Sequence, residues 1–125
     1  MNPQELRVYQ QGDGGQPFTV WLAALKDLEA RARIRTRLAR LSLGNMGDCR
    51  ALDGGVWELR IDWGPGYRVY FARIGAAVLL LLCGGDKTTQ SQDIDRAKDY
   101  LKDYQARSAP TQGKKRQGQR RKRRV

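Results

Sequence analysis

Residues 55–71, which read GVWELRIDWGPGYRVYF, constrain the fold more than any other stretch of this chain. Apolar and polar side chains alternate on both sides of residues 64–66, as in a β-hairpin with a short glycine-bearing loop. Because neighbouring side chains of a strand point to opposite faces, one face of the hairpin is apolar and predicts the wall of a core. The other face collects Glu58, Arg60, Asp62, Arg68 and Tyr70.

A three-residue loop predicts the register of this hairpin, with Asp62 opposite Arg68 and Arg60 opposite Tyr70. Two arginines and a tyrosine on one rigid sheet face suit a phosphate, because guanidinium forks match its oxygens. A solvated sheet face with cross-strand ion pairs, such as Asp62 with Arg68, accounts for the same pattern without a ligand. Alternation alone leaves both interpretations open.

The chain before the hairpin predicts one strand and two helices. Residues 6–10 alternate briefly and indicate a short first strand, and Pro17 suits the first turn of a helix. A helical pattern then continues, or restarts after a small kink, through residues 28–43, and Gly44 ends it as a C-terminal cap.

After a short strand at residues 49–52 and the hairpin, the apolar run AAVLLLLC of residues 76–83 predicts a central strand covered on both faces. Thr89 and Gln92 stand at capping-box spacing and open a last helix. The element order is therefore β-α-α-β-β-β-β-α. We predict an α+β fold, with two N-terminal helices packed as a pair on a mostly antiparallel sheet of four to five strands and a C-terminal helix.

Composition restricts the class of protein. A chain of 125 residues with 40% hydrophobic residues suits one domain with a modest core. The longest apolar run is far shorter than a membrane span, and the N-terminus lacks the order of a signal peptide. We therefore predict a cytoplasmic protein in which Cys49 and Cys83 stay reduced. The chain has no histidine, which removes imidazole-based zinc sites and histidine acid–base pairs, and we predict neither a metal nor a cofactor.

The net charge of +11 is concentrated at the C-terminus. Residues 110–125 hold 8 basic residues and no acidic residue, whereas residues 1–109 hold 16 basic and 13 acidic residues. We predict one folded domain over 1–109 and a disordered basic tail over 110–125, because the tail has almost nothing apolar to bury. Such a tail either binds polyanions by counterion release or only keeps the protein soluble. Its candidate RNA- and ribosome-binding residues are Lys114, Lys115, Arg116, Arg120 and Arg121.

The second predicted helix is also rich in arginine. Arginines flank its apolar stripe on both sides, and three of them, Arg33, Arg37 and Arg40, are further candidates for RNA or ribosome binding. A solvated helix that keeps its charges in water is the alternative explanation of the same pattern.

Residues 5–106 resemble the RelE/ParE superfamily of bacterial toxins, and within it the HigB-like, phage-derived branch of addiction-module killer proteins. The likeness is carried by GVWELR at residues 55–60, YRVYF at 67–71, and LCGGDK at 82–87 before an Asp-Ile-x-x-Ala helix. The resemblance implies a toxin that is neutralised by a cognate antitoxin, often of the helix-turn-helix type. It also implies cleavage of mRNA in the ribosomal A site, and hence inhibition of translation.

The resemblance also implies candidate catalytic residues. The arginine after the tyrosine of the YRVYF motif is Arg68, and the basic residue after the last strand is Lys87. Where several relatives carry a histidine or tyrosine near the start of the final helix, this chain has residues 92–94, Gln-Asp-Ile. The general base is therefore open, with Tyr70, Glu58 and Tyr100 as candidates.

Cleavage of RNA by its own 2′-hydroxyl needs a base, an acid and positive charge at the phosphate. Arg60 and Arg68 beside Tyr70 predict a field that lowers the pKa of the tyrosine. Lys87 leaves the central strand beyond a flexible Gly-Gly pair, so that it can reach the same crevice. We therefore predict Arg60, Arg68, Tyr70 and Lys87 as the catalytic residues of a ribosome-dependent mRNA endoribonuclease.

Two other functions remain open. A ParE-like toxin would bind and poison DNA gyrase without chemistry of its own. The absence of the relatives' histidine or tyrosine from the start of the last helix favours this function. A non-catalytic nucleic-acid-binding module would act mainly through the basic tail.

Overall fold

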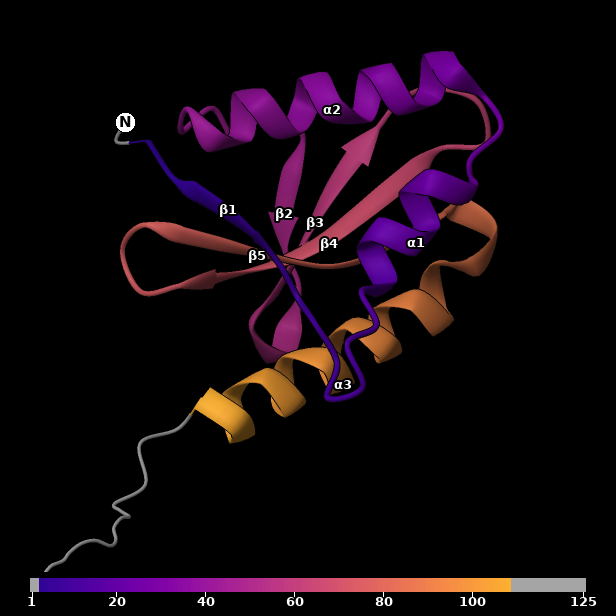
Figure 1. The fold of residues 1–125 in the computed structure, drawn as a ribbon. Coiled ribbons are helices and arrows are strands. Elements are labelled where there is room, and N and C mark those ends of the chain that lie inside the picture. Colours follow the sequence, from indigo (N-terminus) through magenta and orange to yellow (C-terminus); the bar gives the residue numbers. More distant parts are fainter. Residues whose placement is uncertain (1–2, 109–125) are drawn as a thin grey trace, which may run out of the picture.

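The computed structural model describes residues 3–108, in which the elements follow the predicted order (Figure 1). They are β1 (Glu5–Val8), α1 (Pro17–Ala24), α2 (Leu28–Ser42), β2 (Cys49–Ala51), the short 3-10 turn η1 (Asp53–Gly55), β3 (Val56–Ile61), β4 (Tyr67–Ile74), β5 (Val78–Asp86), the 3-10 turn η2 (Lys87–Thr89) and α3 (Gln90–Ser108). The strands form one sheet in the order β1-β5-β4-β3-β2. β1 runs parallel to β5 and the other neighbours are antiparallel. The α+β class with a mostly antiparallel sheet is therefore confirmed.

The predicted boundary between domain and tail lies outside the described residues, as do the five basic tail residues named above. Within residues 3–108, no helix is long and apolar enough to cross a membrane.

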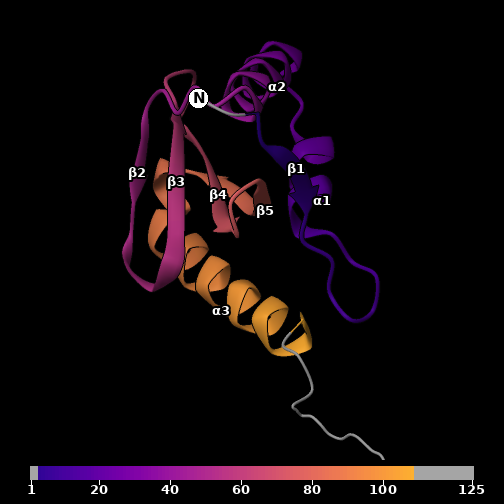
Figure 2. The same cartoon turned by 90° about the vertical axis from the view of Figure 1, so that its left-hand side faces the viewer.

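The helices cover both faces of the sheet (Figure 2). α1 and α2 share one face, and α3 crosses the opposite face. The predicted packing of α1 and α2 as a pair is not matched exactly, because α1 lies on β5 whereas α2 lies on β3. The chain is extended at Leu25, which ends α1, and the carboxylate of Asp27 caps α2 in a new direction.

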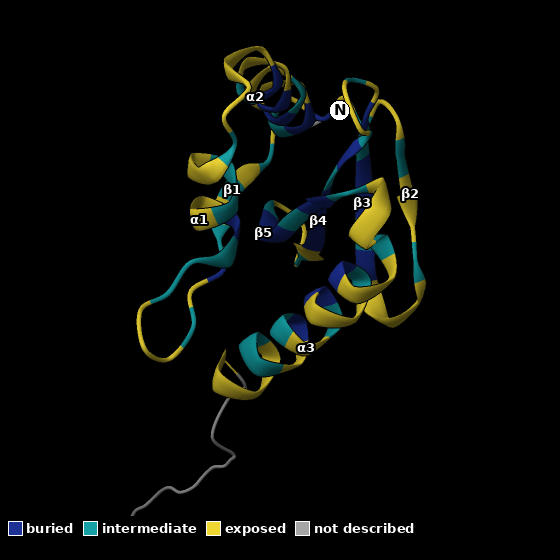
Figure 3. Ribbon diagram, turned by 90° about the vertical axis from the view of Figure 1, so that its right-hand side faces the viewer, coloured by how far each residue is buried: buried dark blue, intermediate teal, exposed yellow. Residues whose placement is uncertain are grey.

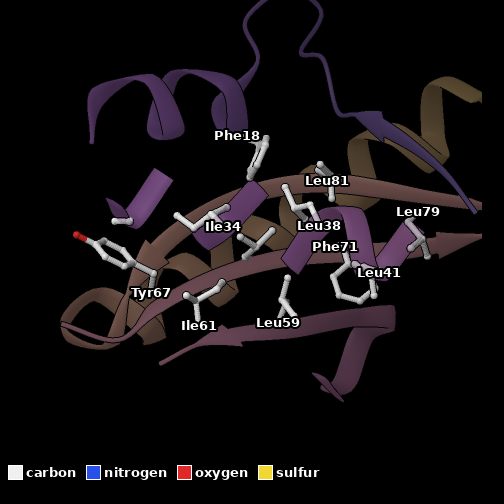
Figure 4. Packing of buried hydrophobic residues seen from close by; sticks show 12 residues of the cluster. Phe18, Ile34, Leu38, Leu41, Leu59, Ile61, Tyr67, Phe71, Leu79 and Leu81 are labelled. Carbon is white, nitrogen blue, oxygen red and sulfur yellow. The ribbon is translucent and has the colours of Figure 1, made fainter. Parts of the chain in front are cut away.

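Each face of the sheet carries its own buried cluster, and the helices turn their exposed residues away from the sheet (Figure 3). In the first cluster the apolar stripe of α2, with Ile34, Leu38 and Leu41, packs on Leu59 and Phe71 of the sheet (Figure 4). The second cluster joins Val56, Tyr70, Ala72 and Leu82 of the sheet to Ala97 and Leu101 of α3. The predicted central strand is buried on both faces as expected, and it includes Cys83.

The predicted hairpin register is wrong. Arg60 pairs with Arg68 and Glu58 pairs with Tyr70, so the connection between β3 and β4 spans residues 62–66. Two positive φ angles, +57° at Gly64 and +84° at Gly66, allow this longer turn. Asp62 therefore belongs to the loop and is not opposite Arg68.

The predicted assignment of residues to the two faces of β4 is confirmed. Tyr67, Val69 and Phe71 belong to the cluster under α1 and α2, while Tyr70 and Ala72 belong to the cluster under α3. The part of the second face that holds Glu58 and Tyr70 is not a solvated surface, however, because α3 covers it and leaves both residues fully buried. Cys49 and Cys83 are free thiols, one half-buried and one buried.

Candidate active site

A groove of about 470 Å³ lies at the turn between β3 and β4, beside the end of β5. It brings together three of the four predicted catalytic residues, Arg60, Arg68 and Lys87. They come from three neighbouring strand ends: Arg60 lies opposite Arg68, and Arg68 lies opposite Gly85, two residues before Lys87. The remaining lining consists of Asp48, Asp62 and the loop residues 64–66.

Arg68 is held on two sides. Its Nη1 donates to the carbonyls of Gly66 at 3.1 Å and Tyr67 at 3.2 Å, and its Nε lies 3.9 Å from Oε2 of Glu58. The side chain is 12% exposed. Among the described residues, its Nη2 has no hydrogen-bond partner. One edge of a fixed guanidinium therefore remains available to an anion in the groove.

Arg60 is neutralised within the groove. Its Nη2 and Nε lie 2.8 and 3.2 Å from Oδ1 of Asp48, and its backbone N–H donates to the Asp48 carbonyl. The carbonyl of Arg60 in turn accepts a 2.9 Å hydrogen bond from Nη1 of Arg37 on α2. Arg60 is thus a paired cation whose position is tied to the loop before β2 and to α2.

Lys87 is exposed, and its ammonium group forms no ion pair within residues 3–108. Asp86 fixes the turn that carries it: its carboxylate accepts from the backbone N–H and the hydroxyl of Thr88, and it forms a capping box with Thr89. The hydrogen bond from the Thr88 hydroxyl lowers the pKa of Asp86. The predicted capping box of Thr89 with Gln92 is therefore wrong, because the box lies one turn earlier and begins at Asp86.

The predicted flexible Gly-Gly pair before Lys87 is also wrong. Gly84 and Gly85 belong to β5 and pair with Val69 and Arg68. A Cβ atom at Gly84 would overlap the Trp21 indole, and one at Gly85 would overlap the Asp93 carboxylate. These glycines serve close packing, so Lys87 stands on a rigid strand end.

Tyr70 does not line the groove. Its side chain is fully buried under α3, and its hydroxyl has no hydrogen-bond partner among the described residues. Burial and the nearby carboxylate of Glu58 raise the pKa of Tyr70. The predicted lowering of this pKa is wrong, because desolvation outweighs the effect of Arg68.

The other two candidate bases do not line the groove either. Glu58 is fully buried behind Arg68. Tyr100 stacks on Tyr9 at 5.0 Å between ring centroids and lines a separate hollow between α1 and α3.

The three α2 arginines predicted to bind RNA line a second hollow of about 390 Å³, which shares Asp62 with the groove. They are not equally available. Arg37 is engaged by the Arg60 carbonyl, and Arg33 lies 3.0 Å from Glu29 and stacks over the Trp63 ring at 3.9 Å. Arg40 is exposed and forms no ion pair among the described residues.

The sequence did not predict Asp48 in the groove, whereas it did predict Asp62 beside the arginines. Asp48 follows a glycine-rich loop with no strand pattern, and alternation assigned Asp62 to the strand face rather than to the turn. Asp62 is exposed and makes neither an ion pair nor a hydrogen bond within residues 3–108. No three side chains of the kinds that bind metals gather into a metal site in the same range.

The groove is lined by Arg68 and Lys87, whose side chains are of the kinds that bind phosphate, and by the unpaired carboxylate of Asp62. Donors that are held in place before a ligand arrives stabilise developing negative charge well, because they need little reorganisation.

A protein-family model described as "Phage derived protein Gp49-like (DUF891)" matches residues 20–102, which include every residue of the groove. An uncharacterized protein of Haemophilus influenzae is 51% identical to this chain over 81 residues, which cover 65% of this chain and 82% of that protein.

Proposed function

Because the chain belongs to the Gp49-like family of phage-derived proteins, we propose that it is the toxin of a type II toxin–antitoxin system of the RelE/ParE superfamily, HigB-like branch. Its activity is the cleavage of mRNA on the ribosome, in the cytoplasm, and a cognate antitoxin, of the helix-turn-helix type, neutralises it. The observation that carries this proposal is the groove in which Arg60, Arg68 and Lys87 converge.

The reaction needs no cofactor. The 2′-hydroxyl of one nucleotide attacks its own 3′-phosphate and gives up its proton, and the bond to the next 5′-oxygen breaks. The departing 5′-oxygen takes a proton from water, so that a 2′,3′-cyclic phosphate and a 5′-hydroxyl are formed. Lys87 and the free Nη2 of Arg68 donate to the phosphate oxygens, which gain charge in the transition state. Arg60, paired with Asp48, shapes the groove wall.

Asp62 is the proton acceptor of this proposal. It is the groove carboxylate that no cation of the described residues engages, whereas Asp48 is occupied by Arg60. A positioned carboxylate that takes the proton of the 2′-hydroxyl contributes on the order of 10²–10⁴-fold to such a reaction. A carboxylate is a weak base at neutral pH, so the ribosome must supply the alignment of the substrate.

Poisoning of DNA gyrase, as in ParE-like toxins, is the second candidate. The burial of Tyr70 favours it, because that burial removes the tyrosine hydroxyl from the groove and with it one predicted catalytic group. A gyrase poison needs no phosphate groove, and this groove is the reason to place cleavage first.

Induced expression distinguishes the two targets. We expect new 5′ ends within translated mRNA codons soon after induction, with plasmid supercoiling unchanged. Purified RNA without ribosomes should stay intact, because the groove alone does not orient the substrate. Altered supercoiling with intact mRNA would contradict the proposal and favour gyrase, whereas growth arrest with neither change would point to nucleic-acid binding without chemistry.

A further inference from the structure

Glu58 is a fully buried carboxylate at the point where four elements meet. Its Oε1 lies 3.0 Å from Nε of Arg50 on β2, and its Oε2 accepts a 2.6 Å hydrogen bond from Nε2 of Gln90 at the start of α3. Nε of Arg68 on β4 lies 3.9 Å from the same Oε2. A carboxylate removed from water needs such partners, because burial strongly disfavours an unpaired charge.

Arg68 depends on Glu58 more than Glu58 depends on Arg68. Arg50 and Gln90 already engage both oxygens of Glu58, so the carboxylate has partners without Arg68. Nε of Arg68, in contrast, is buried and has no hydrogen-bond partner among the described residues. The Glu58 carboxylate forms the ion pair with this nitrogen, at 3.9 Å.

A guanidinium group is planar and rigid, so holding it at two edges sets the direction of the third. The Gly66 and Tyr67 carbonyls hold Nη1 of Arg68, and Glu58 lies against Nε. The remaining edge, Nη2, is then directed by contacts that are complete before any ligand binds.

We propose that Glu58 is a positioning residue, which holds the Arg68 guanidinium in the orientation that binds a phosphate of single-stranded RNA in the groove. This inference rests on the proposed function. Glu58 does not line the groove and is fully buried, so it neither touches the substrate nor serves as its base. It acts through Arg68, and Arg50 and Gln90 hold it in place.

The direction in which Glu58→Gln changes RNA affinity distinguishes a positioning role from a purely electrostatic effect of the Glu58 charge. Glu58→Gln removes a negative charge close to an anion site, so by Coulomb's law alone it would tighten RNA binding. A positioning role predicts the opposite, because the glutamine amide no longer attracts the Arg68 Nε and the guanidinium can turn away from the groove.

The test measures binding of a short single-stranded RNA, made uncleavable by 2′-O-methylation, to the full chain at one fixed salt concentration. We expect Glu58→Gln to weaken RNA binding by about tenfold, because the charge-assisted hydrogen bond from Arg68 to the RNA phosphate is lost. Glu5→Gln is the matched control, because Glu5 also pairs with an arginine, Arg7, at 2.7 Å but lies on β1 away from the groove. It should bind like the wild type.

A double-mutant cycle adds a measurement that a merely structural role would not move. In an Arg68→Ala background, Glu58→Gln should cause no further loss of RNA binding, because its effect passes through Arg68. Additive losses would overturn the proposal. So would a Glu58→Gln variant that folds and binds RNA as tightly as the wild type, or more tightly.

A second variant keeps the proposal testable if Glu58→Gln does not fold. Glu58→Asp retains the charge but withdraws the carboxylate from Arg68, and we expect an intermediate loss of binding. Wild-type binding by Glu58→Asp would overturn the inference. If Arg68→Ala and Lys87→Ala also bind like the wild type, the proposed function itself fails. If those two variants weaken binding and the Glu58 variants do not, the positioning role alone fails.

Discussion

Gly85 lies in β5 where the Asp93 carboxylate of α3 packs against the strand, so a side chain there would overlap a buried group. Gly84 has the same relation to Trp21 on the other face of the sheet. Two adjacent glycines are typical of a flexible turn, and nothing nearby in the sequence indicates Trp21, which comes more than sixty residues earlier. Close approach between distant residues is therefore a part of the fold that local patterns do not show.

Gly85→Ala should lower the free energy of unfolding by about 1–3 kcal/mol, the usual cost of overpacking a well-packed core. The Asp93 carboxylate must move, and its hydrogen bond from the Thr89 hydroxyl must break or shift. Chemical denaturation measures the change. Gly12→Ala is the control, because no atom lies within 4 Å of a Cβ built there. An unchanged stability of Gly85→Ala would mean that the strand and α3 separate more easily than this packing implies.

The two cysteines predict a loss of stability at alkaline pH. Burial raises the pKa of Cys83 from its ordinary 9.0 to about 12, and that of Cys49 to about 11. The folded state therefore keeps protons that the unfolded chain releases. The resulting stabilisation is complete below pH 9.0, declines as pH rises above it, and is lost above the folded pKa values.

Chemical denaturation under reducing conditions at about pH 8 and about pH 10 should show this decline. Cys83→Ala removes one of the two thiols, so its stability should fall less between the two pH values than that of the wild type. An equal fall in both proteins would show that Cys83 does not contribute.

At the scale of elements, periodicity predicted the strands, the helices and the faces of β4, because side-chain direction follows directly from backbone geometry. It did not predict the register of the hairpin. Register depends on the turn, and the positive φ angles at Gly64 and Gly66 take Asp62 and Trp63 out of the strand. The loop is two residues longer than predicted, and Arg68 therefore lies opposite Arg60 instead of Asp62.

The same limit applies to the candidate site. Arg60, Arg68 and Lys87 converge because they occupy neighbouring strand ends, which the predicted topology already brings together. Tyr70 shares the face of Arg68, but its exposure depends on where α3 lies, and no local pattern gave the face that α3 covers. Asp48 was not predicted for a related reason, since it is a loop residue whose neighbours are set by tertiary packing.

Asp27 links two elements that flank the second hollow. Its carboxylate caps α2 by accepting from the backbone N–H groups of Glu29 and Ala30, and it also accepts a 3.0 Å hydrogen bond from the Trp63 indole. The hydrogen bond from Trp63 lowers the pKa of Asp27. The ionised Asp27 carboxylate therefore stabilises the folded protein above its ordinary pKa of 3.8. This contribution is lost as pH falls through the lower pKa of the folded state.

Asp27→Ala should lower the melting temperature at neutral pH, because α2 loses its cap and the hairpin loop loses an anchor. The difference from the wild type should shrink under strongly acidic conditions, where the wild-type carboxyl is protonated too. Asp95→Ala is the control, because Asp95 is exposed on α3 and its side chain makes no hydrogen bond or ion pair among the described residues. Equal melting temperatures for the two variants would contradict the capping role.

At the scale of the whole molecule, the sheet separates two cores, and the groove lies at one end of the sheet. α2 and α3 stabilise the sheet from opposite faces, and the groove forms where β3, β4 and β5 end beyond them. The groove therefore exists only in the complete fold, because its cations come from residues 60 to 87 on three strands. Buried partners hold Arg68, while Lys87 is exposed and free among the described residues. Lys87 can thus be removed with little expected cost in stability.

The most direct test measures growth arrest on induction of the Lys87→Ala and Arg68→Ala variants, each with a melting curve. Lys102→Ala, an exposed lysine on α3, is the control and should stay toxic. We expect both groove variants to fold and to lose about 10²–10³-fold in mRNA cleavage, the usual cost of losing one preorganised donor to transition-state charge. Arg68→Lys should restore part of the toxicity, because lysine keeps the charge without the fork. If both alanine variants fold and remain fully toxic, the groove is not an active site and a gyrase-binding mode of action takes its place.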